Sequence, residues 1–223
     1  MSDFTRFAIY YLPPEGGDLA RFGAHWLGWD VDAACTIQQD PDLSALTETP
    51  RRYGFHATIK PPFRLKEGAD PTALADATRR FCAATPAVAL AGLSVRCIGG
   101  FVALLPDGPT NQIDALAASC VETLDRFRAR PAEAELAKRR AVGLTPEQDR
   151  NLHRWGYPHV MDEFRFHMTL SSRLDPTDRQ RLTRIAKERL PALPRPFPID
   201  ELTLVGERKD GRFQTLHRYA LSG

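Results

Sequence analysis

The sequence has few cysteines, which are widely spread, and it has no long run of apolar residues. The cysteines are Cys35, Cys82, Cys97 and Cys120. Because none of them belongs to the C-x-x-C spacing of a zinc or redox site, we interpret them as free thiols in a reducing compartment. No segment approaches the ~18 consecutive apolar residues of a membrane span, and the N-terminus has no basic stretch followed by a long apolar one. These absences predict a cytoplasmic protein with no membrane partner.

An excess of charge of one sign is also missing. The 30 Lys and Arg residues against 28 Asp and Glu residues leave a formal net charge of +2. This is far from the basic excess of a protein that holds many backbone phosphates, so an anionic partner is expected to be small and RNA is the less favoured partner. The 43% apolar and 26% charged residues are typical of a globular protein, and 223 residues are enough to bury a core.

Strand and helix patterns alternate along the chain, with Pro or Gly at most junctions. The order strand, helix, hairpin occurs in residues 53–105 and again in 163–221, which indicates an internal duplication. The first strand of each copy is expected over 53–60, ending at Pro61-Pro62, and over 163–172. Outside the copies we expect a strand over 6–12, a helix around 19–27, an irregular stretch over 30–50, a helix over 111–130 and a charged helical insertion over about 131–154. This order favours a single α+β domain over 1–223, with helices on largely antiparallel sheets and intertwined lobes, rather than a doubly wound parallel fold.

The duplication is clearest in one short motif. Phe55-His56-Ala57-Thr58-Ile59 matches Phe166-His167-Met168-Thr169-Leu170, so that F-H-x-T precedes an aliphatic residue in both copies. The two motifs are half the chain apart, and composition alone makes two such matches improbable. The pair therefore indicates a shared function rather than coincidence.

Strand alternation places His and Thr of each motif on one face and the residues between them on the other. The same alternation places Gly54 and Lys60 beside His56, and Arg165 and Ser171 beside His167. We therefore predict two catalytic residues, His56 and His167, and four substrate-binding residues, Thr58, Thr169, Lys60 and Arg165.

If the two halves pack about a pseudo-twofold axis, a phosphate between them would meet an imidazole on each side. One neutral imidazole could take a proton from the attacking water or hydroxyl, and the other could give a proton to the leaving oxygen. The ordinary histidine pKa of about 6.5 allows both forms near neutral pH. The threonine hydroxyls could donate hydrogen bonds to phosphate oxygens as charge develops on them.

Other interpretations of these side chains are less specific. A single strand histidine is more often structural than catalytic, but two matched ones are not easily explained in that way. His153 and His159, near Asp162 and Glu163, could suggest a metal site, although H-x5-H matches no standard ligand spacing. We interpret His25 and His217 as structural. The basic run Lys138-Arg139-Arg140 is expected to be a solvated face, or at most a rim that attracts an anionic substrate.

With its paired H-x-T motifs in equivalent strands, the chain resembles the 2H phosphoesterase superfamily. The segments RYGFHATIKPPF at 52–63 and RWGYPHVMDEFRFHMTL at 154–170 resemble the branch that is often encoded beside carbon–phosphorus lyase genes. The resemblance implies a bilobal fold with two sheets lining a central cleft and helices outside. It also implies that His56, Thr58, His167 and Thr169 act on a cyclic phosphodiester without a metal or other cofactor.

For the phosphonate-associated branch, the resemblance implies a small ribosyl cyclic phosphate, such as 5-phosphoribosyl 1,2-cyclic phosphate, as substrate. Two alternatives are an RNA-end processing 2',3'-cyclic phosphodiesterase and a non-catalytic nucleotide or phosphate binding module. The low net charge disfavours the first alternative. The second does not explain two proton-transfer groups. The sequence leaves open which histidine is the base and whether the chain forms oligomers.

Overall fold

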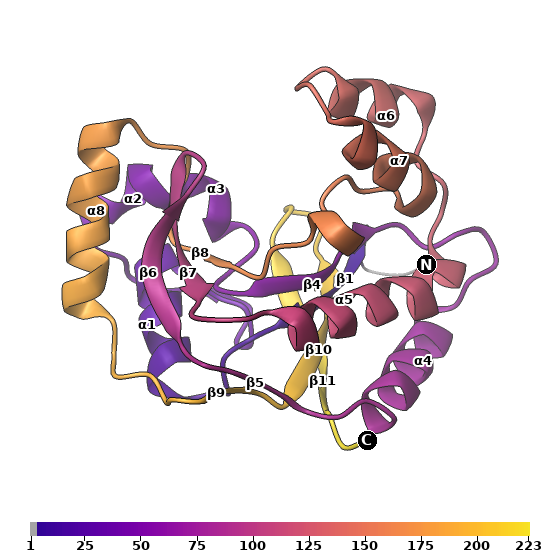
Figure 1. The fold of residues 1–223 in the computed structure, drawn as a ribbon, viewed down its shortest axis with the longest axis horizontal. Helices are drawn as coiled ribbons and strands as arrows, with labels where there is room; N and C mark the ends of the chain where they lie inside the picture. Colours follow the sequence, from indigo (N-terminus) through magenta and orange to yellow (C-terminus); the bar gives the residue numbers. More distant parts are fainter. Residues whose placement is uncertain (1–3) are drawn as a thin grey trace.

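The centre of the computed structural model, which describes residues 4–223, is one seven-stranded sheet (Figure 1). Its order is β11-β10-β1-β4-β8-β7-β6, and each of its strand pairs is antiparallel. The strands are β1 (Phe7–Tyr11), β4 (Ala57–Phe63), β6 (Leu93–Ile98), β7 (Phe101–Pro106), β8 (Met168–Thr169), β10 (Glu201–Glu207) and β11 (Phe213–Ala220). Two small sheets pair β2 (Trp29–Asp30) with β3 (Cys35–Thr36) and β5 (Val88–Leu90) with β9 (Phe197–Ile199).

Helices lie at both ends of this sheet, with α1, α2 and α8 on the left of Figure 1 and α4 to α7 on the right. The α-helices are α1 (Asp18–Leu27), α2 (Pro41–Ser44), α3 (Glu48–Arg51), α4 (Pro71–Ala83), α5 (Asn111–Leu124), α6 (Glu133–Arg140), α7 (Pro146–Trp155) and α8 (Pro176–Arg189). Three single 3-10 turns are η1 (Ala45–Thr47), η2 (Asp125–Phe127) and η3 (Met161–Glu163). Asp70 and Asp175 cap α4 and α8 through backbone N–H groups, with Pro at the first helical position.

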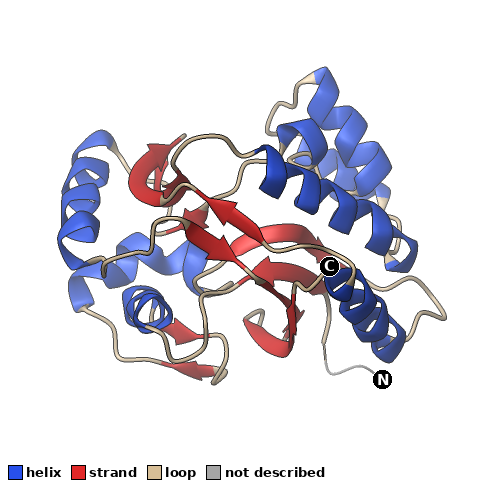
Figure 2. Cartoon of the chain, turned by 60° about the horizontal axis from the view of Figure 1, so that its bottom comes forward, coloured by secondary structure: helices blue, strands red, loops and turns tan. Residues whose placement is uncertain are grey.

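The duplication is visible in the topology. β4, α4, β5 and the hairpin β6–β7 are followed in the second copy by β8, α8, β9 and the hairpin β10–β11. In the sheet, β4 lies on the same side as the hairpin of the second copy, with β1 between them, whereas β8 lies beside the hairpin of the first. Each half of the sheet therefore contains strands of both copies, and Figure 2 shows the strands, in red, with the helices around them. The α+β class with antiparallel sheets, predicted from the sequence, is confirmed.

The core is formed by the residues that alternate with the motif positions. Phe55 and Ala57 in the first copy are buried, as are Phe166, Met168 and Leu170 in the second. They belong to one apolar cluster that continues into α1, α4 and α5. Trp26 of α1 donates its indole N–H to the carbonyl of Leu170 at 2.8 Å, which fixes this helix against the second motif. Packing on this side leaves the other face of the motif strands available for the site.

Several element boundaries differ from the sequence expectation. β4 does not stop at Pro61-Pro62 but runs through both prolines to Phe63. A proline can occupy a strand where no ladder hydrogen bond is required of it, and β4 pairs with β8 only at Ala57, so its second edge is free beyond that point.

The other differences follow from local irregularity. β8 covers only two residues of the strand expected over 163–172. The helix expected over 111–130 ends at Leu124 and continues as η2. The stretch over 30–50 contains short strands and turns of helix. Among residues 4–223, no helix is both long enough and apolar enough to cross a membrane.

Candidate active site

The two H-x-T motifs meet where β4 and β8 lie side by side. Ala57 pairs with Met168, the central residue of one motif with that of the other. Because the strands are antiparallel, this register brings His56 toward Thr169, and Thr58 toward His167. All four side chains are half-buried and line one cavity of about 650 Å³. The pseudo-twofold arrangement of the motifs therefore produces a single site with an imidazole and a hydroxyl from each copy.

Both imidazoles are held in the same way. Nδ1 of His56 lies 2.9 Å from the carbonyl oxygen of Gly54, and Nδ1 of His167 lies 2.7 Å from that of Arg165. A carbonyl can only accept, so each Nδ1 carries a proton and donates it to the carbonyl two residues earlier. In the neutral form Nε2 is then the acceptor, and in His56 it accepts from the Thr58 hydroxyl at 3.0 Å. In both rings the backbone carbonyl thus occupies Nδ1, and Nε2 is the nitrogen that does not bond to it.

Gly54 makes the hydrogen bond to His56 possible through its backbone conformation. Its φ is +74°, which residues with a Cβ rarely adopt, and an added Cβ would lie 1.8 Å from Cγ2 of Val31. Any larger residue would therefore displace the carbonyl that orients the imidazole.

The surroundings of His56 disfavour its charged form. Its ring stacks on Tyr10, with 3.9 Å between centroids and 26° between planes. Desolvation by burial lowers the pKa of His56 to about 4; the Gly54 carbonyl raises it and nearby His167 lowers it further, both by less. His56 is therefore neutral at pH 7.

Lys60, predicted to lie on the cleft side, does not lie there. The register between β1 and β4 shifts, so that Ile9 pairs with Lys60 but Tyr10 pairs with Thr58. This bulge reverses the alternation, and Lys60 is only 2% exposed. Its ammonium donates to the carbonyl of Val121 at 3.0 Å near the end of α5, and it lies 3.7 Å from the carboxylate of Asp125. The prediction that Lys60 binds substrate is contradicted by this position.

The equivalent residue of the second copy, Ser171, also does not line the cavity. Ser171 is 2% exposed, and its hydroxyl accepts from the backbone N–H of Val102 and donates to the carbonyl of Ser172. Arg165, by contrast, is exposed and lines the cavity, as its sequence position predicts. Its guanidinium donates to the backbone carbonyls of Asp162 and Phe164.

Other cavity-lining residues were not indicated by the motifs. Tyr10, Tyr53, Phe101 and Tyr157 supply aromatic walls, and Arg6, Arg139 and His159 supply polar groups. The guanidinium of Arg6 binds both carboxylate oxygens of Glu207 at 2.5 and 2.6 Å, so its charge is already compensated. Tyr53 and Tyr157 belong to the two segments that resemble the phosphonate-associated branch, which is the one sequence signal that includes them.

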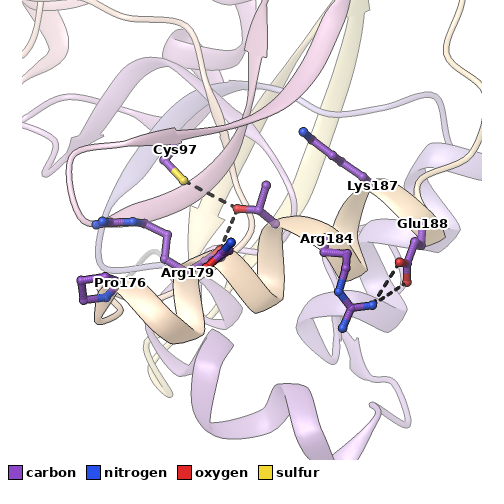
Figure 3. Close-up of a pocket in the computed structure, with 8 residues that line it drawn as sticks. Cys97, Pro176, Arg179, Arg184, Lys187 and Glu188 are labelled. Carbon is purple, nitrogen blue, oxygen red and sulfur yellow. Dashed lines mark hydrogen bonds and ion pairs between the residues drawn. The ribbon is translucent and has the colours of Figure 1, made fainter.

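Two other candidate sites, the possible metal site at His153 and His159 and a concavity beside α8, have fewer groups that could act on a substrate. Among residues 4–223, no group of three or more His, Cys, Asp or Glu side chains is placed to hold a metal ion, so the possible site at His153 and His159 is not assembled in this part of the chain. A second concavity of about 620 Å³ lies against α8 and Cys97 (Figure 3). Arg184 there pairs with Glu188 at 3.1 Å, and Cys97 contacts the Thr183 hydroxyl at 3.6 Å. None of the predicted site residues lines it.

Comparison with known proteins places this arrangement in a family. A family model described as "Protein of unknown function (DUF1045)" matches residues 58–214, well over half of the chain. The chain belongs to the DUF1045 family. The match includes both threonines of the motifs and His167.

Two curated relatives are similar over much of the chain, and both are named "Ribose 1,5-bisphosphate phosphokinase PhnN". The one from Janthinobacterium sp. (strain Marseille) is 40% identical over 232 residues, which cover 98% of this chain and 51% of the relative. The one from Laribacter hongkongensis (strain HLHK9) is 34% identical over 177 residues, covering 78% and 41%. The chain thus spans about half the length, or less, of the curated relatives it matches.

The fold matches that of a solved phosphoesterase. The crystal structure of E. coli LigT complexed with 3'-AMP superimposes with a TM-score of 0.50 and 16% identity, covering 99% of each chain. At this identity the likeness concerns the fold alone. At that level it agrees with the α+β fold expected from the sequence.

Proposed function

We propose that this protein hydrolyses a small cyclic phosphodiester without a metal ion, using His56 and His167 as general base and general acid. The observation that carries the proposal is the antiparallel pairing of Ala57 with Met168, which brings both H-x-T motifs to one cavity. A phosphate bound there would have an imidazole Nε2 on either side. This is the arrangement that in-line displacement requires.

We assign the role of base to His56. Its low pKa keeps the ring neutral at pH 7, and the Gly54 carbonyl holds the proton on Nδ1, so that Nε2 has a lone pair. Nε2 removes a proton from water as the water oxygen bonds to phosphorus. The bond from phosphorus to the leaving ester oxygen breaks, and protonated His167 gives its Nε2 proton to that oxygen. The product is a phosphomonoester with a free hydroxyl.

The hydroxyls and one cation stabilise the charge on phosphate. Thr58, which donates to His56 in the free protein, would turn toward a phosphate oxygen when substrate arrives and would release Nε2 for water. Thr169 is its counterpart in the second copy. Arg165 lies two residues before His167 at the cavity. It forms no ion pair with a carboxylate among residues 4–223, so its charge is available for the phosphate.

A ribosyl cyclic phosphate is the substrate class that best fits this cavity and the relatives. The cavity of about 650 Å³ is within the range for a small molecule, and its tyrosines offer surfaces for a sugar. The relatives are named for ribose 1,5-bisphosphate, itself a phosphorylated ribose. This chain contains no G-x-x-x-x-G-K-[ST] segment for binding nucleotide phosphates, so we do not extend the kinase name to it.

The test is hydrolysis of a panel of cyclic phosphates, including 5-phosphoribosyl 1,2-cyclic phosphate, followed by phosphorus NMR in the presence of EDTA. Short RNAs ending in a 2',3'-cyclic phosphate complete the panel. We expect a phosphomonoester product from a ribosyl cyclic phosphate, and none with the His56→Ala protein. Preferential turnover of RNA ends would show that the substrate is RNA rather than a small molecule. Loss of activity in EDTA, restored by zinc or manganese, would contradict the mechanism, and binding without turnover of any substrate would support a binding module.

A further inference from the structure

One residue of the cavity lining comes from the helical insertion rather than from the duplicated halves. Arg139 lies on α6, the middle residue of the basic run Lys138-Arg139-Arg140, and it is the one member of that run that lines the cavity. Lys138 and Arg140 are exposed, and Arg140 pairs with Asp149 of α7 at 2.6 Å. The run is therefore not a uniformly solvated face.

The hydrogen-bonding capacity of Arg139 is only partly used. Its Nε is buried and has no hydrogen-bond partner among residues 4–223. A terminal nitrogen donates to Glu135 at 3.2 Å, but that carboxylate also binds Arg64 at 2.6 Å. Two guanidinium groups thus share one carboxylate, which leaves a net positive charge. A buried N–H without a partner is costly, and an anion in the cavity would satisfy it.

The groups around Arg139 complete a site for an anion. The guanidinium lies 5.1 Å from the ring centre of Tyr157, and the ring of His159 contacts that of Tyr157 edge-on at 5.8 Å. Burial lowers the pKa of His159. Glu163 raises this pKa, whereas His167 and Arg139 lower it further. His159, Arg139 and His167 all line the same cavity. Glu163 is the one carboxylate that lines the described cavity, and it accepts from Gln148 at 2.8 Å.

We propose that Arg139, with Tyr157 and His159, forms a second anion subsite that binds a phosphate monoester on the substrate, separate from the phosphodiester that is cleaved. This inference rests on the proposed function and narrows it: the substrate is a cyclic phosphodiester that also carries a terminal phosphate. The planar guanidinium can bind such a phosphate through two N–H groups, one of which is the unpartnered Nε. The insertion thereby determines which cyclic phosphates the protein accepts.

The test compares two substrates that differ only in that phosphate, ribosyl 1,2-cyclic phosphate and its 5-phosphorylated form. The natural protein is expected to prefer the phosphorylated substrate by about tenfold to a hundredfold in kcat/KM, the usual value of a charge-assisted hydrogen bond. Arg139→Gln should reduce this ratio to near one, mainly through KM. Lys138→Gln, one position away and exposed, is the matched control and should retain the preference. Because both substrates are measured on one preparation, the ratio does not depend on the fraction of protein that is folded.

A binding measurement separates failure of the subsite from failure of the proposed function. Calorimetry with ribose 1,5-bisphosphate and ribose 1-phosphate needs no turnover. Tighter binding of the bisphosphate, lost in Arg139→Gln, would support the subsite even if no cyclic phosphate were hydrolysed. Equal affinity for the two ligands, or a preference that Arg139→Gln does not change, would overturn it even if hydrolysis were observed.

Discussion

At the scale of single residues, the proposed mechanism depends on two histidines, each with its Nδ1 held by the carbonyl two residues earlier. Replacing either His56 or His167 with Ala should lower kcat by about 10² to 10⁴ fold, the usual contribution of a positioned acid or base. Both side chains are half-buried at the cavity, so neither replacement opens a hole in the core. The measurement is turnover of each variant beside a melting curve. If the two act in one concerted displacement, the double variant should be little worse than either single one; near-normal turnover of a well-folded single variant would remove that histidine from the mechanism.

The low pKa of His56 makes both activity and stability depend on pH. In a plot of kcat/KM against pH, the acidic limb reports loss of the proton from His56 and should have its midpoint near pH 4. Between about pH 6.5 and pH 4 the unfolded chain binds a proton at this position that the folded protein does not, so the free energy of unfolding should decrease as the pH falls through this window. Urea unfolding at several pH values, compared with the His56→Gln variant, measures this contribution. A variant with the same pH dependence as the natural protein would show that His56 is not the group responsible.

At the scale of elements, strand alternation predicts the motif faces well and fails at irregular strand ends. His56, Thr58, His167 and Thr169 reach one cavity because two-residue alternation holds over those short segments. Two positions further on, the β4 bulge turns Lys60 into the core, and no sequence pattern marks that bulge. The Pro61-Pro62 pair indicates a strand end, yet the free edge of β4 tolerates it.

Strand alternation cannot predict the cavity residues on the α6 side. Arg139 approaches the motifs through the placement of the insertion in three dimensions, and Tyr157 lies in the segment that follows α7. The charged composition of the insertion indicates helices, but it does not indicate that one of them contributes to the cavity.

Lys60 provides a test of the corrected strand register. Because it is buried against Val121 and Asp125, and Asp125 has a second partner in Arg128 at 2.7 Å, replacement by Met should change the free energy of unfolding by no more than about 1–2 kcal/mol. Its effect on KM should be less than about twofold, since the side chain does not reach the cavity. Arg165→Ala is the comparison, and it should raise KM with little change in kcat. The measurement is steady-state kinetics of both variants. A large rise in KM for Lys60→Met would show that the ammonium of Lys60 contacts the substrate in the natural protein.

At the scale of the whole molecule, the two copies are interleaved, so the halves should not fold separately. β4 reaches the hairpin β10–β11 through β1, β8 pairs with the hairpin β6–β7, and β5 pairs with β9. Separation of the copies would leave each half of the sheet without strands that it needs, although the half-sheets themselves are joined through only one residue pair in β4 and β8. We therefore expect a single cooperative unfolding transition for the chain.

Calorimetry measures the size of that cooperative unit. For 223 residues unfolding together, the enthalpy near 60 °C should be about 150 kcal/mol, with the van't Hoff and calorimetric values equal. Two independent lobes would instead give a van't Hoff enthalpy of about half the calorimetric one. A fragment of residues 1–130 should lack the sheet signal in circular dichroism, because β1 and β4 lose their hairpin partner β10–β11. A folded fragment, or two resolved transitions, would show that the lobes are separable and that the site forms only when they dock.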